Sequence, residues 1–163
     1  MRKVRWGSIL LGLMMLLTLL TVTAFAAETT VAATDNAAAN GQALVDAVSR
    51  ASEGDTIVVP AGTYEIEKPI VITESITIKG ANAGLDARPG KAERTAETVL
   101  DGNKITDGWD SGCIFVIAAD NVTIDGFTFD NANYAAVAIG SADNTIAIFT
   151  NRAQYFNFPG KVV

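Results

Sequence analysis

The chain has 163 residues, of which 49% are hydrophobic, and a formal net charge of −6. This length allows one domain with a hydrophobic core plus a targeting segment, and the acidic balance argues against nucleic acid as a partner. Because the sequence contains no histidine, His-dependent catalytic triads and His-ligated zinc sites are excluded.

The N-terminus has the pattern of a secretory signal peptide. Basic residues among the first five positions precede a Leu-rich apolar run from Ile9 to Val22, and Ala24-Phe25-Ala26 supplies the small residues that a signal peptidase requires. We therefore expect residues 1–26 to be removed by cleavage after Ala26, which predicts a secreted or cell-surface protein. The alternative is an uncleaved segment that anchors the chain in a membrane.

Cleavage would make the chain more acidic. Removing residues 1–26 leaves 9 basic and 18 acidic residues, a net charge of −9. Such a surface repels anionic lipid, and it repels an acidic polysaccharide unless a cation or a local basic patch intervenes. Cys113 is the only cysteine, so no internal disulfide forms, and its apolar neighbours predict a buried thiol.

The next segments differ in pattern. Residues 27–39 form an Ala/Thr run without amphipathic spacing, which predicts a flexible linker. Asn40 then suits the N-cap of a short helix over residues 40–51, because apolar residues recur there at helical spacing. We expect residues 40–163 to form this helix and the first turns of one β domain.

Short β-type runs follow the helix, separated by tight corners. They cover residues 56–59, 70–72, 76–78 and 98–100, and then five runs between 114 and 148. Polar segments at 81–97 and 104–112 predict loops that project from the strands. Since no helical crossover separates the runs, we expect a coil of parallel strands, each above its counterpart one turn earlier.

Repeats support such a coil. Ala119-Asp120-Asn121 returns as Ala142-Asp143-Asn144. The spacing of the two copies falls within the range that is typical of solenoids. Stacked Asn121 and Asn144 would form an amide ladder. Under the shift that superimposes the two tripeptides, Ile146 and Ile148 face inward only if the second corner carries one extra residue.

A second repeat is an aliphatic residue, a charged residue and a glycine. It ends the runs at residues 78–80, 100–102 and 124–126, so that the three glycines follow one another at nearly equal spacing. We interpret these endings as one corner that recurs in successive turns.

The segments 43–48, 53–64, 76–82 and 121–127 together resemble the N-terminal part of the pectin lyase-like superfamily. The resemblance implies an all-β, right-handed parallel β-helix whose open end is closed by a short capping α-helix. In lyase members of the superfamily, acidic calcium ligands and a basic Arg or Lys lie on later turns. Nothing in this chain matches them residue by residue, so we expect no catalytic residue, cofactor or metal site here, and calcium only in a full-length lyase parent.

Three carboxylates near strand ends are candidate ligands. Asp101, Asp125 and Asp130 are of the type that binds calcium or serves a glycosidase. Their Gly and Asn neighbours favour the alternative that they are corner residues bonded to nearby backbone. The cluster Asp107-Gly108-Trp109-Asp110 lacks the alternation of a dedicated calcium loop.

Two further features suit a glycan. Trp109 and Tyr134 offer aromatic faces that stack on sugar rings, or that cover apolar edges between loops. Arg88, Lys91 and Arg94 form a basic patch that suits an anionic glycan, although a solvated loop of mixed charge is the favoured interpretation.

The sequence therefore predicts an exported β-helix module, the N-terminal part of a protein that binds or processes extracellular polysaccharide, without catalysis of its own. The alternatives are a polysaccharide lyase of the pectate lyase type and a structural cell-surface repeat protein. After Ile148 the strand pattern ends without an amphipathic cap. Because solenoids need capped ends, we expect a fragment of a longer protein whose open end self-associates.

Overall fold

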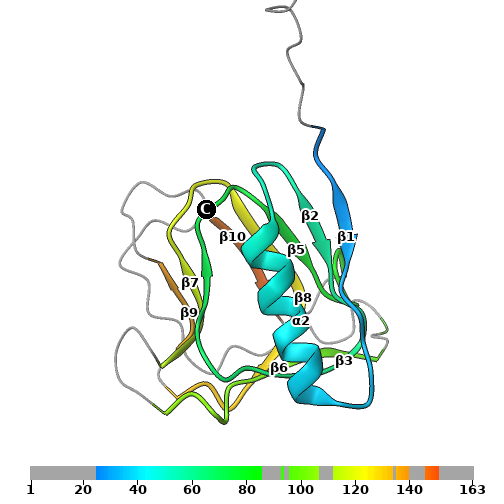
Figure 1. Ribbon diagram of the computed structural model, residues 1–163, viewed down its shortest axis with the longest axis vertical. Helices are drawn as coiled ribbons and strands as arrows, with labels where there is room; N and C mark the ends of the chain where they lie inside the picture. Colours follow the sequence, from blue (N-terminus) through cyan, green and yellow to red (C-terminus); the bar gives the residue numbers. More distant parts are fainter. Residues whose placement is uncertain are drawn as a thin grey trace, which may run out of the picture.

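The structure is a computed structural model. It describes residues 25–85, 93, 96–106, 112–133 and 135–139, and the backbone of 146–150. Within these residues the chain is mostly β, with parallel strand pairings throughout and one helix (Figure 1). The predicted class, all-β with a short N-terminal helix, agrees with this arrangement.

The helix α2 spans Ala37–Arg50 and begins earlier than predicted. Its N-cap is Asn36, whose side chain accepts a hydrogen bond from the Ala39 N–H at 3.0 Å. Asn40, the predicted cap, lies inside the first turn and is buried. The alanines at 37–39 favour helix, so the helix extends back to the earlier asparagine.

The segment expected to be a flexible linker is ordered. Strand β1, Glu28–Thr30, pairs in parallel with β2, Thr56–Val58, and residues 37–39 belong to α2. A sequence pattern cannot detect β1, because its three side chains are all exposed and its stability comes from backbone pairing with β2. The signal-peptide and domain boundaries remain predictions.

The strands form three parallel ladders. The first contains β1, β2, β5 (Thr77–Lys79), the first half of β8 (Val122–Asp130) and β10 (Ile146–Thr150). The second contains β3 (Gly62–Glu65), β6 (Thr98–Asp101) and the second half of β8. The third contains β4 (Ile70–Ile72), β7 (Cys113–Ile117) and β9 (Ala135–Ile139).

From β2 onward the chain visits the ladders in a fixed order. It passes β2, β3 and β4, then β5, β6 and β7, then the two halves of β8 and β9, before β10 pairs with β8. Each new strand therefore pairs in parallel with the last strand already in its ladder. The predicted projecting loops fall between β5 and β6 and between β6 and β7, in the second pass.

The glycine endings do not mark one recurring corner. Gly80 and Gly126 are counterparts, since Lys79 is the register partner of Asp125 and the Gly80 N–H donates to the Asp125 carbonyl at 2.7 Å. Gly102 follows β6 and lies in the second ladder. The nearly equal spacing of the three glycines therefore does not measure the repeat, because the loop between β5 and β6 lengthens the second pass.

The register of β10 on β8 has the one-residue offset that inward-facing Ile146 and Ile148 would require. Ile146 pairs with Val122 and Ile148 with Ile124, one position beyond the shift that superimposes the two Ala-Asp-Asn tripeptides. Asn144 lies outside the described residues, so its stacking on Asn121 remains a prediction.

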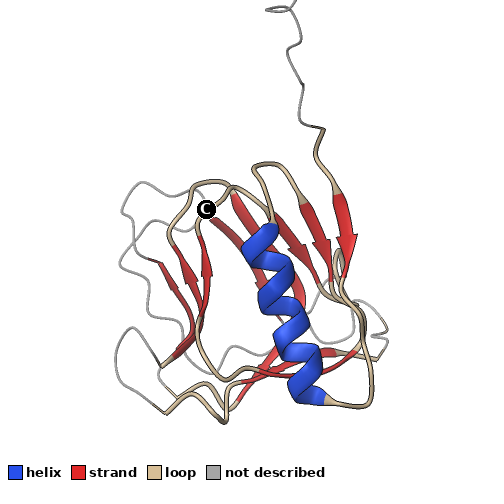
Figure 2. Cartoon of the chain, in the orientation of Figure 1, coloured by secondary structure: helices blue, strands red, loops and turns tan. Residues whose placement is uncertain are grey.

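The core lies between the ladders, and α2 covers one end of it. Figure 2 shows three groups of strands around the helix, which crosses in front of them. Leu44 and Val48 of α2 are buried in the same hydrophobic cluster as the inward side chains of the strands. Within this core, Phe115 of the third ladder packs against Phe127 and Phe129 of the second, with ring centroids 6.4 and 6.0 Å away. Cys113 is buried, as predicted.

Candidate functional site

An acidic column runs across the outer face of the second ladder. Glu65, Asp101 and Asp130 are register partners on β3, β6 and β8. Their preceding neighbours Tyr64, Leu100 and Phe129 are buried in the core. Because successive side chains of a strand point to opposite faces, the three carboxylates share the outer face.

Asparagine side chains hold the central carboxylate of this column. Asp101 accepts hydrogen bonds from the Asn103 N–H, the Asn103 Nδ2 and the Asn131 Nδ2, each at 3.0 Å. Asn131 adopts a left-handed backbone with φ of 50°, and its N–H donates to Asp130 Oδ1 at 3.1 Å. At one end of the column, Lys104 Nζ lies 3.8 Å from Glu65 Oε2.

The asparagines also line a shallow depression of about 510 Å³ beside the column. Asn133 closes one side by donating its Nδ2 to the Thr106 carbonyl at 3.3 Å. The lining consists mainly of amides, backbone and small apolar groups: Gly102, Asn103, Ile105, Thr106, Asn131, Ala132 and Asn133. Amides carry both donors and acceptors, so this surface suits a ligand rich in hydroxyl groups.

The structure separates the three predicted carboxylates. Asp101 and Asp130 lie side by side in register, whereas Asp125 lies in the first ladder and accepts the Gly84 N–H at 2.7 Å. Asp101 and Asp130 each accept the backbone N–H of a residue that directly follows in the corner, as the alternative interpretation describes, whereas the Gly84 N–H that Asp125 accepts comes from another turn of the chain. Within the described part of the chain, no three Asp, Glu, Cys or His residues are grouped closely enough to hold a metal ion.

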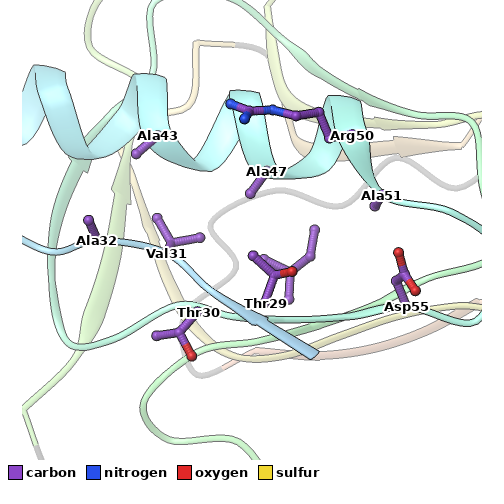
Figure 3. Close-up of a pocket in the computed structure, with 10 residues that line it drawn as sticks. Thr29, Thr30, Val31, Ala32, Ala43, Ala47, Arg50, Ala51 and Asp55 are labelled. Carbon is purple, nitrogen blue, oxygen red and sulfur yellow. The ribbon is translucent and has the colours of Figure 1, made fainter. Parts of the chain in front are cut away.

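A second hollow, of about 340 Å³, lies between α2 and the segment around β1 (Figure 3). Val31, Ala43 and Ala47 give it an apolar lining, with Arg50 and Asp55 toward one end. The Asp55 carboxylate accepts the Ser52 N–H and the Ala27 N–H, each at 2.8 Å, and these bonds lower its pKa.

The sequence alone does not identify the asparagines of the depression, or Asp55, as candidate site residues. The signals present are the polar runs Asp101-Gly102-Asn103 and Asp130–Asn133, whose residue types indicate only corners. For Asp55, nothing in the sequence indicates that Ala27 lies beside it, since 28 residues separate them. Trp109, Tyr134, the basic loop of Arg88, Lys91 and Arg94, and the acidic segment 107–110 lie outside the described residues.

The amino-acid sequence that forms these parallel ladders matches a known family. A sequence model described as Rhamnogalacturonase A/epimerase, pectate lyase-like, matches residues 21–153. The chain belongs to this family. The predicted membership of the pectin lyase-like superfamily is thereby confirmed, and the pectate lyase-like family indicates a polysaccharide-related function.

No curated protein and no solved structure gives a significant match. The rhamnogalacturonase A/epimerase, pectate lyase-like match thus indicates a polysaccharide-related function, and it assigns no role to an individual residue. In the part of the chain that the structure describes, no helix has the length and apolar character needed to cross a membrane.

Proposed function

We propose that the chain is an exported parallel β-helix module that binds extracellular polysaccharide without cleaving it. Three features support this proposal: the family, the N-terminal sequence pattern of a signal peptide, and the fixed order in which the chain visits three parallel ladders. A right-handed β-helix produces that order when each pass is one turn of the coil.

The observation that carries the proposal is the asparagine-lined depression beside the acidic column. Carbohydrate recognition needs donors and acceptors fixed in space, because each sugar hydroxyl both donates and accepts. Asn103 and Asn131 are fixed by their bonds to Asp101, so little side-chain entropy remains to be lost when a sugar binds.

The charge of the surface favours a neutral or weakly charged polymer. Glu65, Asp101 and Asp130 place three carboxylates along the column, and among the described residues Lys104 forms an ion pair with the first of them. A polyuronate would approach this column against like charge. A divalent cation that bridges the two would reverse this preference.

Two variants test this proposal: one removes an amide side chain from the depression, and its control removes an amide side chain outside it. Asn131→Gly deletes a lining amide at φ of 50°, directly after β8, and Asn121→Gly deletes an exposed amide at φ of 53°, directly before β8. Glycine tolerates both backbones, so neither variant strains the fold. Affinity electrophoresis should show roughly tenfold weaker polysaccharide binding for Asn131→Gly, a loss of about 1.4 kcal/mol, and unchanged binding for Asn121→Gly. Equal binding by the two variants would rule out this depression as the binding site.

A second candidate is a polysaccharide lyase of the pectate lyase type, which the family match favours. Its products are unsaturated uronates, which absorb in the ultraviolet. We expect no increase in absorbance with pectate, alginate or chondroitin, in the presence or absence of calcium. Clear turnover would replace the binding proposal with the lyase.

A further inference from the structure

The start of β1 is fastened to the turn before β2 by its backbone. The Ala27 N–H donates to Asp55 Oδ1 at 2.8 Å, and the Ala27 carbonyl accepts the Thr56 N–H at 2.8 Å. The other carboxylate oxygen of Asp55 is held by the Ser52 N–H at 2.8 Å. Asp55 is therefore fixed in place with one oxygen directed at the nitrogen of residue 27.

That nitrogen is the one that signal-peptide cleavage would release. The sequence Ala24-Phe25-Ala26 predicts hydrolysis of the peptide bond between Ala26 and Ala27. In this step a signal peptidase adds water across the bond, so that Ala26 leaves with a carboxylate and Ala27 keeps the amine. An α-amine has an ordinary pKa of about 7.7–8.0 and takes up a proton at neutral pH.

We propose that Asp55 is the docking site for the N-terminal ammonium group of the processed chain. Cleavage would replace an amide donor by a cation at the same nitrogen, and a neutral-donor hydrogen bond would become an ion pair. Charge-assisted hydrogen bonds of this kind are stronger than those of neutral donors. Processing would thus secure β1, the outermost strand of its ladder, to β2.

The surroundings are compatible with a docked cation. Gly54 places no side chain there, and a Cβ built on it would lie 3.5 Å from the Ala26 Cβ. Three carboxylates belong to the segments around this turn: Glu28 pairs in register with Thr56, Glu53 precedes Gly54, and Glu74 precedes Ser75, whose carbonyl accepts the Gly54 N–H. Arg50 lines the hollow with Asp55 but pairs with Asp46 at 3.3 Å, so the local charge favours an ammonium group.

The first test uses the exported protein itself. Its N-terminal residue, found by mass spectrometry, should be Ala27, and its α-amine should react with an acylating reagent at a higher pH than in the unfolded chain. We expect the pH of half-maximal labelling to rise by about 0.5–1 unit on folding, because an adjacent carboxylate favours the protonated amine. A different N-terminus, or equal labelling curves in the folded and unfolded states, would overturn the proposal.

The second test compares two chains that end at Val163, one beginning at Ala27 and one retaining Phe25 and Ala26. The shorter chain should melt about 1–5 °C higher at pH 6. This difference should disappear in Asp55→Asn and persist in Glu53→Gln, which removes a neighbouring exposed carboxylate. A difference that persists in Asp55→Asn would contradict docking at Asp55. The inference rests on the export proposed above and not on carbohydrate binding, so the two proposals fail independently.

Discussion

Asn40 fastens the helix to the chain on both sides of it. Its Oδ1 accepts the Thr34 N–H at 2.8 Å and the Thr34 hydroxyl at 2.9 Å, while its Nδ2 donates to the carbonyls of Thr34 at 2.8 Å and Thr63 at 3.0 Å. The side chain is buried, so its loss would leave these groups without partners in a site closed to water.

We therefore expect Asn40→Ala to lower the free energy of unfolding by about 2–4 kcal/mol. Asn36→Ala, which removes only the N-cap bond to Ala39, should cost about 1 kcal/mol. Urea denaturation followed by circular dichroism measures both variants. A larger loss for Asn36→Ala would show that capping, and not the buried amide, determines the position of the helix.

Asp55 makes stability depend on pH in the acid range. Hydrogen bonds from the Ser52 and Ala27 N–H groups lower its pKa below the ordinary value of 3.8. A carboxyl group with a lowered folded pKa contributes stability above the unfolded pKa, and this contribution is lost as the pH falls through the folded pKa. The difference in unfolding free energy between the parent chain and Asp55→Asn should hence be positive at pH 6 and shrink as the pH falls below the ordinary pKa. A difference independent of pH would contradict this role.

The residue that caps the helix could not be predicted from the sequence alone. Asn36 and Asn40 both precede helix-forming residues, and either satisfies the sequence pattern of an N-cap. The choice between them depends on Thr63, which lies 23 residues away and accepts a hydrogen bond from Asn40. A contact over that separation is not visible in local spacing.

Strand β8 belongs to two ladders, so its backbone must turn between the half that pairs with β5 and the half that pairs with β6. Gly126 lies between its halves with φ of 82°, and a Cβ there would lie 2.2 Å from the Ala83 nitrogen. Gly54 has a similar φ of 87°, but a Cβ added to it would meet only the Ala26 Cβ, at 3.5 Å. Alanine at residue 54 would therefore introduce backbone strain alone, whereas alanine at residue 126 would introduce backbone strain and a steric clash.

Gly54→Ala should cost about 1–2 kcal/mol through strain alone. Gly126→Ala should cost about 3–5 kcal/mol, because the turn after β5 must also move away from the new methyl group. Thermal unfolding of the two variants measures the difference. Equal losses would mean that the turn adjusts freely and that the close packing of β5 on β8 is not required.

Strand positions are largely predictable from the sequence and strand partners only partly so. Runs such as Ile70-Val71-Ile72 and Val122-Thr123-Ile124 carry the β-branched pattern, and the structure has strands at both. The interpretation of the three aliphatic, charged, glycine endings as one recurring corner is wrong, because this pattern occurs at corners of two different ladders. Local chemistry identifies a corner without identifying which ladder it ends.

At the scale of the whole molecule, charge decides which polymers can approach. The processed chain would carry 9 basic and 18 acidic residues, a net charge of −9. The long-range field of such a protein opposes a polyuronate and is indifferent to a neutral glycan. The proposed class of partner therefore follows from composition, whereas the position of the proposed binding surface needed the fold, since Asn103 and Asn131 come together only through the pairing of β6 with β8.

Titration calorimetry of the exported protein against neutral glycans and polygalacturonate, at low and high salt, tests the proposed function most directly. We expect micromolar binding to a neutral or weakly charged polymer, with little dependence on salt. Binding to polygalacturonate should be weaker and should strengthen as salt screens the repulsion or as calcium is added. Failure to bind any polymer, or heat from continuing depolymerisation, would contradict a non-catalytic binding module.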